Sequence, residues 1–214
     1  MFRDRLDAAE QLARRLSHLK GQHPLVVGIP RGAVPMAKLI ADALDGELDV
    51  VLVHKLGAPG NPEYAIGAIS EDGTLQISEA ADRLFAGGDY LQEEAQAQLS
   101  VLQARRLRYT PGRKPIDVTG RIVVVVDDGS ATGATLLAAL RVLREQRPQR
   151  LIAAIGVAPA DTLSKIEAAA DEVVCLAAPS FFYAVGQFFD DFRQVSDEEV
   201  IELLGHSESA DKPH

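Results

Sequence analysis

The sequence predicts an α/β fold built on a doubly wound, mostly parallel sheet. Short apolar runs alternate along the chain with segments of helical periodicity, which is the pattern of strands joined by covering helices. The run at 122–126 is β-branched and has no polar alternation, as expected of a strand buried on both faces of a parallel sheet. With 214 residues, 47% of them hydrophobic, the chain is long enough for one domain with a substantial core.

The individual elements follow from apolar spacing and from helix-end signals. A first helix is expected at 3–20, because Gly21 and Pro24 end its apolar stripe. Further helices are expected at 35–44, 134–146, 161–170 and 197–205, the last opened by a capping box at Ser196. Strands are expected at 25–29, 49–54, 122–126, 151–157 and 172–176, with a hairpin at 65–70 and 74–78. Residues 1–205 then form one domain, and the polar residues 206–214 form a disordered tail.

Residues 79–120 break the alternation and are expected to form an insertion within this domain. A long, mostly polar helix is predicted at 90–108, and a Pro- and Gly-containing mobile loop at 110–115. The apolar stripe of this helix is thin and consists of Leu91, Ala95, Leu99 and Leu102. A helix with so little apolar surface covers something only part of the time, so we expect a lid or hood that is mobile without ligand.

Composition limits the partners that this chain is expected to bind. The net charge is −9, which does not favour nucleic acid, and the basic cluster at 105–114 is interpreted as a solvated helix end. No stretch approaches the roughly 18 apolar residues of a membrane span, and the first residues do not resemble a signal peptide. Cys175, the only cysteine, lies in an apolar run and is expected to be a small core residue, so a reducing cytoplasm is the expected location.

The segment 123–135 carries most of the functional information. A buried strand ends in Asp127 and Asp128, and small residues then lead into a helix. Ligands bind at the carboxyl ends of parallel strands, where backbone amides and the helix N-terminus attract an anion. Two carboxylates beside a phosphate site require hydroxyls or a cation, which together describe a phosphorylated ribose with a metal. The alternative is an ordinary strand–turn–helix junction in which an Asp caps the helix.

This segment closely resembles the motif by which type I phosphoribosyltransferases bind 5-phosphoribosyl-1-pyrophosphate (PRPP). The resemblance covers about residues 25–192 and implies the fold of that family. It implies that Asp127 and Asp128 hold the ribose hydroxyls and, together with Asp190, contribute to a Mg²⁺ site. The implied 5′-phosphate loop consists of Gly129, Ser130, Ala131, Thr132, Gly133, Ala134 and Thr135. The segments 54–57 and 61–68 further resemble those of a group of bacterial phosphoribosyltransferase-like proteins of unassigned substrate.

Two more segments match pyrophosphate contacts of the family. Pro30, Arg31 and Gly32 follow the first core strand, where the family commonly has a cis peptide, here the bond between Pro30 and Arg31. Lys55 is expected at the end of the next strand, where the family often places a lysine. The resemblance makes Arg31 and Lys55 the catalytic helpers. Taken alone, the two segments are equally compatible with a plain βα turn and a solvated lysine.

The segment from Tyr183 to Asp190 is similar to the base site of 6-oxopurine phosphoribosyltransferases, which casts Tyr183 as a base-stacking residue. The alternative is a satellite core, because five of the seven phenylalanines lie between Phe181 and Phe192. Those enzymes also carry an aspartate three residues after the second acid, where this chain has Ala131. The resemblance therefore implies poor use of hypoxanthine and guanine, and leaves adenine or a smaller nitrogen acceptor open.

The expected function is transfer of phosphoribosyl from PRPP to a small nitrogenous acceptor, with Mg²⁺ as cofactor and release of pyrophosphate. The alternative is a regulatory module of the same fold that senses PRPP without turnover. A Gly-rich P-loop, a dinucleotide-binding turn and a nucleophile elbow are absent from the sequence, which argues against other nucleotide binders and a serine hydrolase. The acceptor stays open, and so does assembly as a homodimer.

Overall fold

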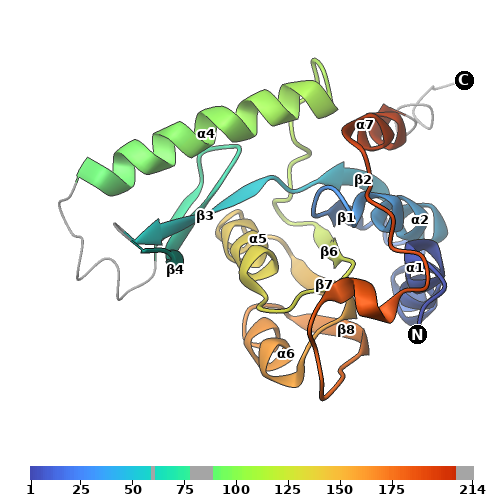
Figure 1. Cartoon of the computed structure of the whole chain (residues 1–214). Helices are drawn as coiled ribbons and strands as arrows, with labels where there is room; N and C mark the ends of the chain where they lie inside the picture. The colour runs from blue at the N-terminus through green and yellow to red at the C-terminus, as the bar shows by residue number, and fades with distance from the viewer. Residues whose placement is uncertain (59–60, 78–88, 206–214) are drawn as a thin grey trace, which may run out of the picture.

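The computed structural model describes residues 1–58, 61–77 and 89–205, with the backbone alone at 61–65 and 89. The tail predicted at 206–214 and the first ten residues of the predicted insertion lie outside the described residues. Within the described chain the elements follow the predicted order of strands alternating with helices (Figure 1).

Five strands form a parallel sheet in the order β2-β1-β6-β7-β8. Their bounds are Leu25–Gly28 for β1, Glu47–Val50 for β2, Ile122–Asp127 for β6, Arg150–Val157 for β7 and Glu172–Ala177 for β8. All four pairings between neighbouring strands are parallel, with β1 and β6 adjacent at the centre. The predicted parallel, doubly wound sheet is therefore confirmed.

Helices cover both faces of this sheet (Figure 1). Their bounds are Arg5–Arg15 for α1, Val34–Leu44 for α2, Ala134–Glu145 for α5, Ala160–Glu167 for α6 and Asp197–Gly205 for α7, with short 3₁₀ turns at Ser17–Leu19 and Val185–Phe188. Val124 and Val126 of β6 join the core formed with α1 and α2. Val123 and Val125 join the core formed with α5. None of these four side chains is exposed, so the prediction of a strand buried on both faces is confirmed.

The strand predicted at 49–54 is wrong. The chain leaves the parallel sheet after Val50 and enters a second, antiparallel sheet of β3 (Val53–Ala58), β4 (Asn61–Ser70) and β5 (Leu75–Ile77). Val51 and Leu52, which connect the two sheets, point into different hydrophobic cores. Because both residues are apolar and buried, nothing in the local pattern marks the point where the backbone changes sheets.

The end of α6 and the start of α7 each differ in part from the prediction. The helix predicted at 161–170 ends at Glu167, and the chain leaves it through a tighter turn in which the Ala169 amide donates to the Ile166 carbonyl three residues back, at 2.9 Å. Ser196 caps α7 as predicted, accepting from the Glu199 amide at 3.1 Å. The carboxylate of Glu199, which a capping box would turn back to Ser196, instead pairs with Arg193 at 3.0 Å.

The insertion contains helix α4 (Asp89–Tyr109), close to the predicted 90–108. This helix lies across the antiparallel sheet, over β3 and β4 (Figure 1). The stripe residues Leu91, Ala95 and Leu102 are buried, so the thin apolar stripe is the face that packs on the second sheet. None of the helices in the described parts of the chain, α4 included, is long and apolar enough to cross a membrane.

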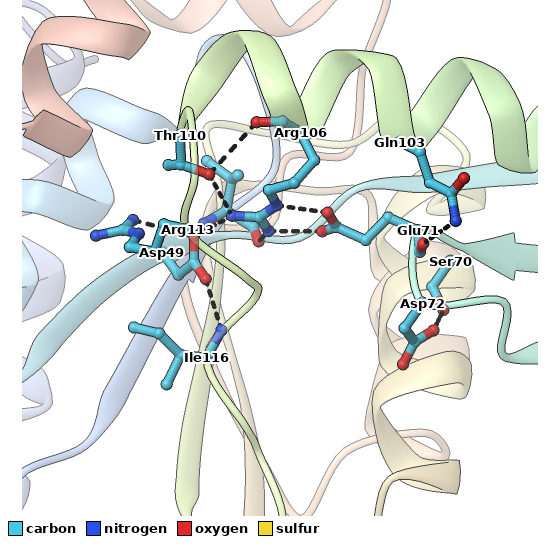
Figure 2. Close-up of polar contacts among 10 residues, drawn as sticks. Asp49, Ser70, Glu71, Asp72, Gln103, Arg106, Thr110, Arg113 and Ile116 are labelled. Atoms are coloured by element: carbon cyan, nitrogen blue, oxygen red, sulfur yellow. Dashed lines mark hydrogen bonds and ion pairs between the residues drawn. The ribbon is translucent and has the colours of Figure 1, made fainter.

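The carboxyl end of α4 is fastened by a buried arginine (Figure 2). Arg106 is 5% exposed and donates to both carboxylate oxygens of Glu71, with 2.6 Å between Nη2 and Oε1. Its Nη1 lies 2.6 Å from Oδ1 of Asp49, and its Nη2 donates to the Val50 carbonyl at 2.9 Å. Part of the predicted solvated basic cluster is therefore a desolvated ion-pair centre, and that interpretation is wrong for Arg106.

The same centre holds the loop that follows α4. The other carboxylate oxygen of Asp49 accepts from the Ile116 amide at 3.0 Å, and Arg113 lies 3.5 Å from Oδ1 (Figure 2). The mobility expected for residues 79–120 stays a prediction. These contacts argue against it for the part from Arg106 to Ile116, because opening there would separate buried charges from their partners.

We predict that Arg106→Met lowers the free energy of unfolding by about 3–5 kcal/mol, the cost of leaving buried charges without their partner. Burial already raises the pKa of Glu71 in spite of the Arg106 ion pair, so the carboxylates would be poorly accommodated alone. Urea unfolding measures the effect. Arg105→Met is the matched control, since its guanidinium is exposed and lies 6.0 Å from the centroid of the Tyr109 ring. Equal losses in the two variants would contradict the prediction.

Candidate active site

The acid pair stands at the carboxyl end of β6, the central strand of the parallel sheet. Asp127 is 9% exposed, and burial, followed by the neighbouring charge of Asp128, raises its pKa to about 8. The Asp128 carboxylate has a cationic partner, because Arg5 Nε donates to its Oδ2 at 2.7 Å. The two adjacent acids are therefore stabilised differently. Burial favours the protonated form of the Asp127 carboxyl, whereas the Asp128 carboxylate is paired with Arg5.

The turn after the pair admits only small residues. A Cβ atom on Gly129 would lie 2.7 Å from the Val185 side chain and 2.8 Å from Val157. A Cβ on Gly156 of β7 would collide with the Asp128 carbonyl oxygen. Gly133, just before α5, has φ +75°, which favours glycine. The backbone of the loop is thus packed directly against β7.

The predicted phosphate loop is shaped by its own hydroxyls. Ser130 Oγ accepts from the Gly133 amide at 3.0 Å, and Thr132 Oγ1 accepts from the Ala134 amide at 3.4 Å. Two anchors hold the loop from outside: the Ser130 amide donates to the Val157 carbonyl at 3.0 Å, and Thr162 Oγ1 donates to the Ala131 carbonyl at 2.9 Å. The loop leads into the twelve-residue helix α5, whose N-terminus favours an anion.

The predicted pyrophosphate loop lies against the acid pair. The Pro30–Arg31 peptide is cis, as the family resemblance implied. A Cβ on Gly32 would collide with Asp128 Oδ2, so this loop and the carboxylate are in direct contact. The Arg31 side chain is 36% exposed, and its Nη1 lies 3.9 Å from Oδ1 of Asp197 at the start of α7. The structure therefore brings together the two loops for which the sequence predicted separate phosphate contacts.

Lys55 is not where the sequence placed it. It is the third residue of β3 in the antiparallel sheet, and not the last residue of a core strand, because the predicted strand 49–54 is divided between two sheets. Its predicted contact with pyrophosphate stays a prediction. The contribution of Asp190 to a metal site stays one too: no group of three or more potential metal-binding side chains occurs among the described residues.

The aromatic segment contains both buried and exposed rings. Phe189 is buried and packs on Phe2 and Phe192, with ring centroids 5.2 and 4.9 Å apart, as a satellite core would. Tyr183, in contrast, is 88% exposed. Val185 follows it and contacts the turn at Gly129, so the segment reaches the predicted phosphate loop. The Tyr183 ring is exposed and lies two residues before Val185 in the sequence, and its role as a base platform stays a prediction.

Two site residues were missed by sequence reasoning. Arg5, which pairs with Asp128, is 123 residues away from it. Asp197 accepts from the Tyr109 hydroxyl at 2.7 Å, forms an ion pair with Arg108 at 2.8 Å, and lies near Arg31. Both residues occur at helix starts, where acidic and basic side chains are common and ordinarily solvated. No local pattern distinguishes them, since their partners come from distant segments.

Fold and site together define an α/β protein with two adjacent carboxylates and a turn of small residues at the carboxyl end of a central parallel strand, which is where α/β proteins bind ligands. A family model described as the phosphoribosyl transferase domain matches residues 3–193. This match covers most of the chain. The chain therefore belongs to the phosphoribosyl transferase domain family, and its five-stranded parallel sheet covered by helices has the α/β architecture that the family resemblance implied.

Individual relatives agree with this assignment. The chain is 46% identical to TT1426 of Thermus thermophilus, whose crystal structure superimposes with a TM-score of 0.88 and covers 95% of this chain and 97% of that chain. It is 45% identical over 209 residues to a protein of Mycobacterium tuberculosis H37Rv whose name provisionally assigns it as a phosphoribosyl transferase. That match covers 95% of this chain and 46% of the relative, and the counterpart in strain CDC 1551 gives the same values. The chain thus spans about half the length of these curated relatives.

We predict that Asp127→Asn is more thermostable than the wild type at about pH 8 and equally stable near pH 4. The pKa of Asp127 is raised in the folded state from 3.8 to about 8, so its contribution to stability is full below pH 4 and is lost as the pH rises toward 8. Asparagine does not ionise and escapes this loss. Thermal unfolding between pH 4 and 9 measures the difference. Asp190→Asn, at an exposed position, should show the same dependence of thermal stability on pH as the wild type. The same dependence in Asp127→Asn would contradict the raised pKa of Asp127.

Proposed function

We propose that this domain is a phosphoribosyltransferase that uses PRPP and Mg²⁺. In the proposed reaction the bond from ribose C1 to the pyrophosphate oxygen breaks, and a bond from C1 to a nitrogen of the acceptor forms with inversion. The acceptor is a small nitrogenous molecule whose nitrogen loses its proton on bonding. The transferase family of the chain supports the reaction class.

One observation carries the proposal: the contact between Asp128 and Gly32. It joins the loop proposed for ribose and 5′-phosphate to the loop proposed for pyrophosphate. PRPP is a ribose with a phosphate at one end and a pyrophosphate at the other. Two anion-binding loops on either side of a diol-binding acid pair match that distribution of charge and hydroxyls.

In this proposal each part of the chain has a separate task. The acid pair orients the ribose by accepting from its 2′ and 3′ hydroxyls. The amides of the loop from Gly129 to Thr135 bind the 5′-phosphate, whose oxygens replace the hydroxyl oxygens of Ser130 and Thr132 as the acceptors of loop amides. The amides of the cis loop and the Arg31 guanidinium stabilise negative charge as the pyrophosphate leaves. Lys55 would add a second cation if the antiparallel sheet approaches the bound substrate.

The donor set is compatible with magnesium. Mg²⁺ is bound through few protein carboxylates together with substrate phosphate oxygens, so it does not need a dense acidic cage. The oxygens of Asp127 and Asp128 are donors of this kind, and Asp190 is exposed to solvent on the segment that reaches Gly129. When bound, the ion would supply positive charge to the leaving pyrophosphate.

A PRPP-sensing module without turnover would use the same binding residues. Release of pyrophosphate from PRPP, assayed with a panel of nitrogen bases in the presence of Mg²⁺, separates the two functions. Turnover with any acceptor supports the transferase. Tight PRPP binding without turnover across the panel would favour the sensing module.

We predict that Asp128→Asn weakens PRPP binding by about 1.5–3 kcal/mol, which is the scale of a hydrogen bond to a charged group. Asp127→Asn should have an effect of the same order above about pH 8, where the Asp127 carboxyl, whose pKa is raised to about 8, is ionised. Isothermal titration calorimetry with Mg²⁺ present measures both. Asp42→Asn is the control, because this exposed carboxylate of α2 pairs with Lys38 of the same helix. Unchanged affinity in both site variants would remove the assignment of the acid pair.

We also predict poor turnover of hypoxanthine and guanine. Ala131 occupies the loop position where the 6-oxopurine enzymes resembled by this chain carry an aspartate, and alanine has no titratable group. A general acid or base contributes roughly 10²–10⁴-fold in rate. Steady-state kinetics with hypoxanthine, guanine, adenine, uracil and orotate measures the preference. Values of kcat/KM for hypoxanthine or guanine at or above about 10⁴ M⁻¹s⁻¹ would contradict the inference.

A further inference from the structure

Arg5 is a partly buried arginine at the edge of the candidate site, and neither the family motif nor the proposed mechanism uses it. It is the first residue of α1, whose start is set by Asp4: the Asp4 carboxylate accepts from the Asp7 amide at 2.8 Å. Only 12% of the Arg5 side chain is exposed, although the residue lies in the first turn of a helix close to the chain terminus. Burial of an arginine is costly unless its donors are satisfied, so its partners indicate what it is there to hold.

Those partners come from two distant segments, the end of β6 and residues 192–193. Nε donates to Asp128 Oδ2 at 2.7 Å, and Nη1 donates to the Arg193 carbonyl at 2.7 Å. The guanidinium carbon stands 3.8 Å from the centroid of the Phe192 ring, which is a close cation–π contact. The planar group is thus bonded at its edge and stacked on its face, which leaves it little freedom to turn.

The guanidinium and the Asp128 carboxylate together pack on Gly32. A Cβ on that glycine would lie 3.1 Å from Arg5 Nη2 and would collide with Asp128 Oδ2. Arg5 therefore touches the proposed pyrophosphate loop as well as the proposed ribose acid. It also contributes a positive charge beside two adjacent carboxylates, at a place where a polyanionic substrate would otherwise meet repulsion.

We propose that Arg5 is a positioning residue of the PRPP site, acting through Asp128. It holds the Asp128 carboxylate in one orientation against Gly32, so that the acid is ready to accept from a ribose hydroxyl. The contacts with Phe192 and Arg193 keep the guanidinium in place and make the segment that follows β8 a support for the ribose site. This inference rests on the proposed function, since it assumes that Asp128 contacts PRPP.

A double-mutant cycle measured by calorimetry with PRPP and Mg²⁺ tests the proposal. Arg5→Met should weaken PRPP binding about 10- to 100-fold, the fold-change expected for loss of a charged hydrogen-bonding group. Because Arg5 acts through Asp128, the double variant Arg5→Met with Asp128→Asn should bind no more weakly than Asp128→Asn alone. Arg5→Lys keeps the charge but not the planar fork, and should recover affinity to within about tenfold of the wild type.

Arg14→Met is the matched control: it removes an exposed arginine of the same helix, which lies 3.9 Å from Glu10, and should leave PRPP affinity unchanged. Thermal unfolding establishes that each variant is folded at the assay temperature. If Arg5→Met is not folded, Arg5→Lys replaces it in the double-mutant cycle. Additive losses in the double variant, or wild-type affinity in Arg5→Met, would overturn the positioning role while leaving the proposed function intact. Lack of PRPP binding by the wild-type protein would overturn both.

Discussion

The burial of β6 on both faces is the constraint on which the site depends. Its valines at 123–126 are fully buried between two helical layers, and parallel pairing aligns Gly28 of β1 with Val126 and Ile155 of β7 with Asp127. The loops that follow these three strands must therefore meet at one edge of the sheet. They meet so closely that Gly32 and Gly156 have no room for a side chain against Asp128.

Two arginines, the partly buried Arg5 and the buried Arg106, organise the charges around this edge. Arg5 compensates Asp128 at the site, and Arg106 compensates Glu71 and Asp49 where the inserted helix joins the parallel sheet. In each case a planar guanidinium connects segments that are far apart in the sequence, because its fixed donors can satisfy several partners at once. The acid pair itself remains asymmetric, with Asp127 buried and Asp128 paired, which suits two neighbouring acids that must not both carry uncompensated charge.

Prediction from sequence succeeded where one segment contains the whole signal. The β-branched run of β6, the acid pair, the small-residue turn and the long polar helix α4 were each recognisable locally, and family resemblance indicated the cis bond at Pro30–Arg31. It failed where the outcome depends on a partner elsewhere. The apolar run at 49–54 is divided between two sheets, so Lys55 lies in the antiparallel sheet and not at the end of a strand of the parallel sheet. Arg106 of the basic cluster is buried and not solvated.

The sequence by itself determined the class of fold, the family and the loop in which the acid pair lies, because strand periodicity, glycine placement and motif spacing are local properties of the chain. Only the tertiary structure decided which side chains surround that loop. Arg5, Gly32 and Val185 reach it from three separate elements, and their approach depends on how the helices pack on the sheet. Such contacts carry no local signature, since the same residue types at helix starts and in turns are ordinarily solvated.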